Sequence, residues 1–268
     1  MNAIMSFWTA PLQEELNPID YNLWLLSTTL LKRQFGNLTL FTDKRGKELL
    51  LDRFKINNFS DVIVCLDCLP FDGCWSFGKI FVYNMQKEPF MHFDHDVFVY
   101  NSFSEEFEKS NIIVQSTEDL TIPELKEYHK IDKSIACLEN PYGVEFTNKD
   151  RSVNCGVFGG NNLDFIKNYS SKTFELFYSN KDSILKNFDY NSIAVFFEQF
   201  VLSNLLDQYK QPFECILKNE YELAEATSDI IPNSVGYSHF CGWLKKKESY
   251  VKAVQKTIEL EEIQIHYL

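Results

Sequence analysis

Short apolar segments alternate with amphipathic ones through the first 66 residues, and this alternation restricts the possible folds more than any other feature of the sequence. Apolar, β-prone segments predict strands at 3–12, 38–42 and 61–66, and apolar residues at helical spacing predict helices at 18–32 and 44–54. Strands that alternate with helices are typical of a mostly parallel sheet with helices on both faces. We therefore predict an α/β protein with a Rossmann-like, mixed, mostly parallel sheet.

Three polar or aromatic side chains fall where the first two predicted strands end, namely Trp8, Thr9 and Asp43. In open α/β sheets, ligands bind beyond the carboxyl ends of the strands. These residues are therefore candidates for a ligand-binding edge. For Trp8, simple packing in the hydrophobic core is an equally good explanation.

Residues 89–100 read PFMHFDHDVFVY, an apolar segment that two carboxylates interrupt. Val, Phe and Tyr favour a buried strand, in which Asp94 and Asp96 point to one face and His95 points to the other. Buried carboxylates need partners, because an unpaired charge is costly away from water. Two explanations stay open: the oxygens bind a divalent cation, or the aspartates cap backbone groups and pair with Lys or Arg.

The charge balance limits the kinds of partner. With 26 Lys and Arg against 38 Asp and Glu, the 268-residue chain carries a net charge of −12. Such a chain disfavours general binding to nucleic acid, because phosphate contacts need a basic surface. An anionic substrate would have to meet a metal or a local cationic site. The length fits one large α/β domain, and 45% hydrophobic residues indicate a globular protein.

The cysteines indicate a reducing environment. There are seven, an odd number, most lie in apolar segments, and the N-terminus shows no secretory signal. We expect reduced thiols in a cytoplasmic protein. Cys65, Cys68 and Cys74 resemble a zinc knuckle, but no second pair of Cys or His follows at zinc-finger spacing, so buried thiols explain them better. No apolar run reaches the roughly 18 to 20 residues that span a bilayer, so we expect no transmembrane segment.

A later helix places polar side chains in apolar surroundings. The predicted helix at 193–209 is apolar on most sides, so Glu198 and Gln199 need partners or a role. Pairing of Glu198 with a lysine, or capping of a neighbouring helix, would satisfy its carboxylate. Lys79 lies on a predicted helix at 75–86 that leads directly into the D-x-D segment.

The remaining segments add a glycine-rich turn and a late histidine. Gly156, Gly159 and Gly160 lack the Walker and G-x-G-x-x-G spacings, which favours a tight strand-to-helix turn beside the site over direct phosphate binding. His239 lies in an aromatic, Gly-rich loop, where a hydrogen-bonded core histidine is the simpler explanation. Further elements are predicted as strands at 111–115 and 154–160, helices at 123–129, 163–178 and 248–262, and a turn at 140–141.

Taken in this order, the parts resemble a GT-A glycosyltransferase, and are most similar to the glycogenin-like, retaining enzymes of family 8. His239, Gly242 and Lys245 stand at the spacing of the H-x-x-G-x-x-K motif of that family. Residues 198–204 (EQFVLSN) are similar to its D-Q-x-x-L-N helix, and residues 154–157 (NCGV) to its N-x-G-V strand.

The chain also departs from the family pattern. Lys246 and Lys247 stand where the family has Pro-Trp, the D-x-D sequence is DHD, and Glu198 replaces an aspartate. Lys79, in contrast, matches the basic residue that usually precedes D-x-D. We therefore expect a divergent, bacterial branch of GT-A enzymes.

The resemblance implies a metal-dependent hexosyltransferase that retains configuration and uses a nucleotide-diphospho sugar, most simply a UDP-sugar. It implies Mn²⁺ or Mg²⁺ as cofactor, and a histidine ligand favours Mn²⁺. If the reaction inverts configuration instead, Glu198 is the first candidate general base. The implied roles are metal ligation for Asp94, Asp96 and His239; diphosphate or sugar contacts for Lys79, Gly242 and Lys245; base and ribose contacts for Trp8, Thr9 and Asp43; and sugar or acceptor contacts for Glu198 and Gln199.

The expected organisation is a single domain over residues 1–268. It would contain a nucleotide-sugar-binding half at 1–100 that ends in the D-x-D strand, an acceptor-side half at 101–243 and a C-terminal helix at 244–268. The acceptor would be a glycan, a peptide or a small molecule. Two other functions fit the same residues: a metal-dependent nucleotide-sugar phosphohydrolase, because the ligands can activate water, and a non-catalytic nucleotide-sugar-binding protein.

Overall fold

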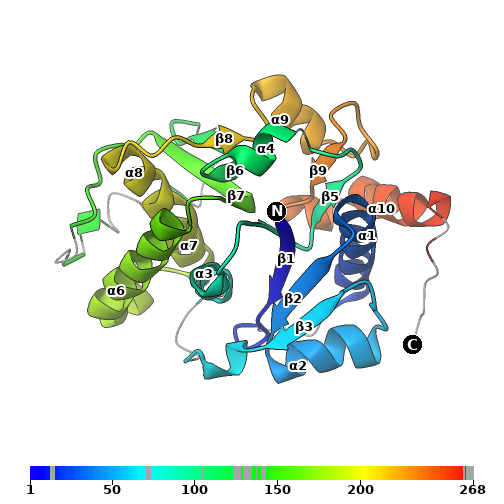
Figure 1. Ribbon diagram of the computed structural model, residues 1–268, viewed down its shortest axis with the longest axis horizontal. Helices are drawn as coiled ribbons and strands as arrows, with labels where there is room; N and C mark the ends of the chain where they lie inside the picture. Colours follow the sequence, from blue (N-terminus) through cyan, green and yellow to red (C-terminus); the bar gives the residue numbers. More distant parts are fainter. Residues whose placement is uncertain are drawn as a thin grey trace. The chain divides into compact units, whose positions relative to one another are not determined.

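The chain folds into two compact units, each built from segments that are far apart in the sequence (Figure 1). Unit 1 consists of Met1–Leu69, Met91–Glu105 and Leu217–Leu268, and unit 2 of Pro70–Phe90 and Glu106–Ile216. The structure is a computed structural model that describes residues 1–12, 16–70, 74–103, 105–122, 128, 135–136, 138–139, 143–261 and 263. The expected single domain, with internal boundaries at residues 100 and 243, remains a prediction.

The strands of unit 1 form one layer and a separate small sheet. The strands β1 (Asn2–Phe7), β2 (Leu38–Thr42), β3 (Asp61–Val64) and β4 (Phe90–Phe93) lie in the order β3-β2-β1-β4. β1 pairs parallel with β2, and β2 parallel with β3; Figure 1 shows these three strands side by side in blue to cyan. β5 (Val97–Val99) pairs antiparallel with β9 (Tyr237–His239), which sets Val97 opposite His239.

The helices of unit 1 are α1 (Pro18–Phe35), α2 (Lys44–Lys47), the π-helix η1 (Glu48–Arg53), the 3₁₀ helices η2 (Leu66–Cys68) and η5 (Gly242–Lys246), α9 (Glu220–Ala226) and α10 (Glu248–Leu260). α1 begins with a capping box, because the Asn17 side chain accepts from the Asp20 N–H and the Asp20 carboxylate accepts from the Asn17 N–H. One buried apolar cluster joins α1, β5, η5 and α10 through Leu23, Leu26, Leu30, Phe98, Phe240, Leu244, Tyr250, Val254 and Ile258.

Unit 2 packs helices against an antiparallel pair of strands. Its elements are β6 (Ile113–Asp119), β7 (Arg151–Gly160), β8 (Glu214–Cys215), α3 (Ser76–Met85), α4 (Glu105–Lys109), α6 (Leu163–Asn187), α7 (Tyr190–Val195), the π-helix η4 (Phe196–Phe200) and α8 (Val201–Gln208). β6 pairs antiparallel with β7 and parallel with β8. Aromatic rings lock α3, α6 and η4 together, since Phe77 lies 4.5 Å from Phe177 and 5.7 Å from Phe197 between ring centroids.

The predicted α/β class, with mostly parallel strand pairing, is confirmed. Two predicted helices are wrong in their detail. The helix expected at 44–54 is α2 continued by the π-helix η1, and the helix expected at 193–209 is divided into α7 and α8 by η4. The expectations at 123–129 and 140–141 lie outside the described residues, apart from Tyr128. Among the described helices, none combines the length and the apolar character needed to cross a membrane.

Candidate metal centre

The D-x-D sequence forms a turn between β4 and β5, which corrects the prediction of one continuous strand at 89–100. The Val97 N–H donates to the Asp94 carbonyl at 3.1 Å, and this bond closes the turn. The Phe240 N–H donates to the Asp96 carbonyl at 2.9 Å and thereby fixes the end of β9 beside the turn. The two aspartates are thus brought together by a turn, and not by the two-residue period of a strand.

Asp94, Asp96 and His239 form a compact cluster of possible metal ligands. Each offers one ligand atom, and these atoms all lie within 4.8 Å of one another. His239 Nε2 lies 3.4 Å from Asp96 Oδ1, and the side chains of Asp94, Asp96 and His239 are 20%, 7% and 5% exposed. Two carboxylates and an imidazole can hold a divalent cation, and an imidazole favours Mn²⁺ over Mg²⁺. The predicted ligand set is therefore brought together in unit 1.

Lys245 forms an ion pair with Asp96, with its Nζ 2.7 Å from Asp96 Oδ2. Burial by itself raises the pKa of Asp96, but Lys245 and His239 outweigh burial and hold this pKa well below its usual range. Burial lowers the pKa of Lys245, but the Asp96 carboxylate outweighs it and raises this pKa above its usual value. Both groups therefore stay charged at neutral pH. An ammonium group occupies one oxygen of a carboxylate that a metal would also use.

His95 does not point away from the cluster, which corrects the prediction from strand geometry. Its ring stacks on Trp24, with 5.1 Å between ring centroids and 16° between planes. Its Nε2 lies 3.4 Å from the Nζ of Lys245. Because the D-x-D sequence is a turn, the residue between the aspartates can contact the same lysine as Asp96.

Gly242 begins η5, the 3₁₀ helix that carries Lys245. Its φ is +53°, a left-handed conformation that favours glycine, and a Cβ at this position would have no atom within 4 Å. The glycine is therefore needed for the backbone conformation, and the space above it is open. Open space over a backbone next to Lys245 suits the close approach of an anionic ligand.

Trp8, Thr9 and Asp43 are all buried in unit 1. Asp43 Oδ2 accepts from the N–H and the hydroxyl of Thr9 at 2.8 and 2.7 Å, and Oδ1 accepts from the Gly46 N–H at 2.7 Å. Asp43 is thus the N-cap of α2 and ties the loop after β1 to the loop after β2. The structure brings Thr9 and Asp43 into one hydrogen-bonded group; their contact with a base or ribose remains a prediction.

In unit 2, Glu198 and Lys79 form a buried ion pair. Lys79 Nζ lies 2.5 Å from Glu198 Oε1, and the side chains are 7% and 0% exposed. The Lys79 ammonium also lies 5.2 Å from the centroid of the Trp75 ring. The explanation that Glu198 pairs with a lysine is therefore confirmed. The roles implied by the resemblance, Glu198 in catalysis and Lys79 at the diphosphate, remain predictions.

Gln199 belongs to a polar cluster that the sequence did not reveal. The Tyr128 hydroxyl lies within hydrogen-bond distance of both the Gln199 side chain and the Glu118 carboxylate. The Asn154 amide donates to Glu118 at 2.8 Å. Glu118 is half-buried near the end of β6. Its neighbours in sequence, Thr117 and Asp119, are exposed and polar, so the sequence offers no signal that separates it from an ordinary surface carboxylate.

Of the three glycines assigned to a tight turn, only Gly160 lies at the end of β7, whereas Gly156 and Gly159 lie within the strand. Gly160 has φ +135°, and a Cβ there would lie 2.1 Å from the Asn111 carbonyl oxygen. Close backbone packing between β7 and the start of β6 thus accounts for this glycine.

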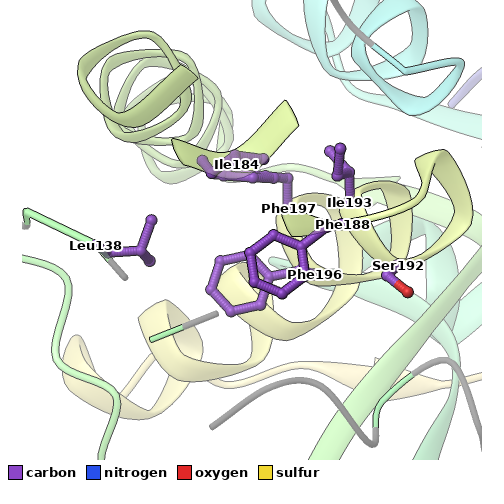
Figure 2. Close-up of a pocket in the computed structure, with 7 residues that line it drawn as sticks. All are labelled: Leu138, Ile184, Phe188, Ser192, Ile193, Phe196 and Phe197. Atoms are coloured by element: carbon purple, nitrogen blue, oxygen red, sulfur yellow. The ribbon is translucent and has the colours of Figure 1, made fainter. Parts of the chain in front are cut away.

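The cavity in Figure 2 has a volume of about 10 Å³ and an apolar lining apart from Ser192. It has room for about one water molecule and is a packing defect, too small for a substrate.

The described cysteines are free thiols: Cys65, Cys68, Cys74, Cys155, Cys215 and Cys241. Within the described part of the chain, no cysteine belongs to a group of three or more possible metal ligands. The zinc-knuckle explanation of Cys65, Cys68 and Cys74 therefore gains no support.

The fold is shared with a solved glycosyltransferase. The crystal structure of the galactosyltransferase LgtC, in complex with donor and acceptor sugar analogs, aligns over 100% of this chain and 97% of its own, with a TM-score of 0.50 and 11% identity. The crystal structure of mouse xyloside xylosyltransferase 1, in its apo form, aligns over 80% of this chain and 84% of its own, with a TM-score of 0.43 and 11% identity. At 11% identity the likeness to LgtC shows the fold alone. The predicted GT-A type of fold is confirmed.

No curated protein matches the chain in sequence. A family model, in contrast, matches residues 1–267, which is nearly the whole length. The chain therefore belongs to the family described as "Family of unknown function (DUF6734)".

Proposed function

We propose that the protein is a metal-dependent glycosyltransferase that takes a sugar from a nucleotide-diphospho sugar. One observation carries the proposal: the ligand atoms of Asp94, Asp96 and His239 lie within 4.8 Å of one another, with Lys245 bound to the same Asp96. The protein that carries this cluster shares its fold with a galactosyltransferase whose structure was solved with donor and acceptor sugar analogs. Two carboxylates and an imidazole beside a lysine suit a metal bound to a phosphate group.

The residues of unit 1 would share the work at the diphosphate. A divalent cation held by Asp94, Asp96 and His239 would act as a Lewis acid and offset the negative charge of the leaving nucleoside diphosphate. Lys245 would exchange its contact with Asp96 for a phosphate oxygen, as a charge-assisted hydrogen bond. The open space over Gly242 would let the diphosphate approach the backbone. An acidic chain needs such a local positive site, because its net charge of −12 repels the donor.

The finer proposals follow the family resemblance. The donor would be a UDP-sugar, the metal Mn²⁺ and the reaction retaining, with a hexose transferred to a glycan, a peptide or a small molecule. Trp8, Thr9 and Asp43 would contact the base and ribose. Glu198 and Gln199 would face the sugar or acceptor, with Lys79 beside them. The free thiols support a cytoplasmic location for the reaction.

The first test is whether a metal links the protein to the nucleotide. UDP binding is measured by titration calorimetry with Mn²⁺ and with EDTA, for the wild type, for Asp96→Ala and for the control Asp119→Ala. Asp119 is an exposed carboxylate on β6 that accepts from Thr121, so its removal should leave UDP binding unchanged. We expect chelation and Asp96→Ala each to weaken UDP binding at least tenfold. UDP binding that is affected neither by EDTA nor by Asp96→Ala would contradict the proposal.

The second test separates transfer from the two other functions. A panel of nucleotide sugars is incubated with Mn²⁺, with and without candidate acceptors, and sugar release and transfer are followed by mass spectrometry. Transfer that depends on an acceptor supports the proposal. Sugar released to water at a rate that no acceptor changes would identify a phosphohydrolase, and donor binding without any turnover would identify a binding protein.

A further inference from the structure

Two further side chains, a serine and a histidine, follow one another in contact next to Asp94. Asp94 is the most exposed of the three possible metal ligands. Ser6 lies on β1 and His92 on β4, and these strands are neighbours in unit 1. Ser6 Oγ is 2.9 Å from His92 Nε2, and His92 Nδ1 is 3.9 Å from Asp94 Oδ1. His92 is only 1% exposed, so its ring cannot leave this position without a change in the core.

The order serine, histidine, aspartate is also that of a nucleophilic triad, but the geometry favours a different role. In a triad the aspartate holds the imidazole with a direct hydrogen bond. Here the separation of 3.9 Å is too long for a hydrogen bond, so the imidazole and the carboxylate are neighbours without the bond that a triad requires. The carboxylate of Asp94 instead belongs to the cluster with Asp96 and His239. The imidazole is therefore better placed to orient Asp94 than to activate Ser6.

Of the three possible metal ligands, Asp94 is the most exposed. Asp96 is held by Lys245 at 2.7 Å, and His239 is 5% exposed on β9. Asp94 lies in the turn after β4, and its side chain is 20% exposed. A carboxylate that moves between rotamers loses more conformational entropy when it binds a metal. A buried imidazole beside it reduces that loss, because it favours one direction of the carboxylate.

We propose that His92, supported by Ser6, is a positioning residue that orients the Asp94 carboxylate for a divalent cation. The inference rests on the proposed function, because it assumes that the cluster binds a metal. Ser6 holds Nε2, which leaves the Nδ1 side of the ring toward Asp94. Loss of a partner that is hydrogen-bonded to a ligating group typically costs 10- to 100-fold in metal affinity. For a neighbour at 3.9 Å we expect an effect at the lower end of that range.

The test uses two substitutions that each keep one half of the imidazole. His92→Asn places its amide near the position of Nδ1 and keeps the group that faces Asp94. His92→Gln places its amide near the position of Nε2 and keeps the group that faces Ser6. His92→Leu removes both. Mn²⁺ affinity is measured by titration calorimetry without nucleotide, and the folded state of each variant is checked by thermal denaturation in EDTA.

We expect His92→Leu and His92→Gln to bind Mn²⁺ at least tenfold more weakly than the wild type, and His92→Asn to restore most of the affinity. Ser6→Ala should weaken Mn²⁺ binding by a few-fold, because the ring loses its anchor. The control Thr28→Val removes the hydroxyl of a buried residue on α1, which donates to the Trp24 carbonyl, and it should lower stability without a change in Mn²⁺ affinity.

Three outcomes would overturn the inference. The first is that His92→Asn and His92→Leu are both folded and both bind Mn²⁺ as tightly as the wild type does. The second is rescue by His92→Gln but not by His92→Asn, because the serine side of the ring would then be the important one. The third is a wild type that binds no Mn²⁺, which overturns the proposed function as well. Wild-type binding that His92→Leu leaves unchanged overturns only the role of His92.

Discussion

The contact between Lys245 and Asp96 leads to a prediction with two opposite signs. In the protein without ligand, the Lys245 ammonium lies 2.7 Å from one oxygen of the Asp96 carboxylate, a group that a metal would use. A bare metal ion therefore has to bind beside a cation that is already paired with the same carboxylate. A nucleoside diphosphate, in contrast, would gain from the same lysine. We predict that Lys245→Met strengthens the binding of Mn²⁺ alone and weakens the binding of UDP in the presence of Mn²⁺.

The burial of the pair sets the magnitude. The Lys245 side chain is 24% exposed and that of Asp96 is 7% exposed, so the pair lies between two limits. Exposed ion pairs contribute up to about 1 kcal/mol, whereas breaking a buried pair costs about 3–5 kcal/mol. We take about 2 kcal/mol as the free energy that the metal no longer has to overcome, which corresponds to an increase in Mn²⁺ affinity of up to about 30-fold. Loss of a charged hydrogen bond should weaken UDP binding by about 1.5–3 kcal/mol, roughly tenfold or more.

Titration calorimetry measures both affinities: Mn²⁺ without nucleotide, and UDP at saturating Mn²⁺. Lys246→Met is the matched control, because it removes an exposed positive charge from the same 3₁₀ helix. This control should leave both affinities within about twofold of the wild type, as expected for a screened surface charge. The reasoning is refuted if Lys245→Met binds bare Mn²⁺ no better than the wild type does.

Three further predictions concern stability. Glu198→Gln leaves Lys79 as a buried charge and should lower the free energy of unfolding, measured by urea denaturation, by about 3 kcal/mol. Adding Lys79→Met should restore most of the loss. A double variant as unstable as the single one would contradict the importance of the ion pair. Gly242→Ala should cost about 1 kcal/mol in the same assay, because φ is +53° but the space is open; no loss would mean that the backbone relaxes. Burial raises the pKa of Cys74 from 9.0 to about 12. The thiol therefore loses its proton at a lower pH in the unfolded chain than in the folded one, and the free energy of unfolding should fall by about 1.4 kcal/mol per pH unit between these two pKa values. Cys74→Ala should flatten that part of the pH profile of stability, and an unchanged profile would contradict the assignment.

Local patterns in the sequence predicted the fold class, and the resemblance to family 8 enzymes implied that Asp94, Asp96 and His239 lie together. Apolar segments of strand length between amphipathic helices have few ways to bury their surfaces, and the bounds of β2 were predicted to the residue. The spacing of His239, Gly242 and Lys245 is preserved on one short segment, so a motif could locate them. The prediction that Asp94 and Asp96 meet was correct, but the reason was wrong, because the apolar residues on both sides hid a turn.

Contacts between distant segments that no motif covers could not be predicted. Nothing in the residues around Lys79 indicates that its ammonium is paired with Glu198, because the pair depends on how α3 packs against η4. The π-helix η4 was missed for the same reason, since its residues have ordinary helical periodicity. His92 reads as one more residue of an apolar strand, and its line with Ser6 appears only when β1 and β4 are neighbours.

The pairing of β5 with β9 has a consequence for how the protein is made. Asp94 and Asp96 leave the ribosome early. The strand β9, which carries His239, and the short helix η5, which carries Lys245, are synthesised much later. Until that late segment emerges, β5 has no strand partner, and the Asp96 carbonyl lacks the Phe240 N–H that it accepts from in the finished protein. Domains tend to fold in the order of synthesis, yet this centre waits for nearly the whole chain. A nascent or C-terminally shortened protein would therefore carry the two aspartates without the histidine and the lysine that lie beside them in the complete fold.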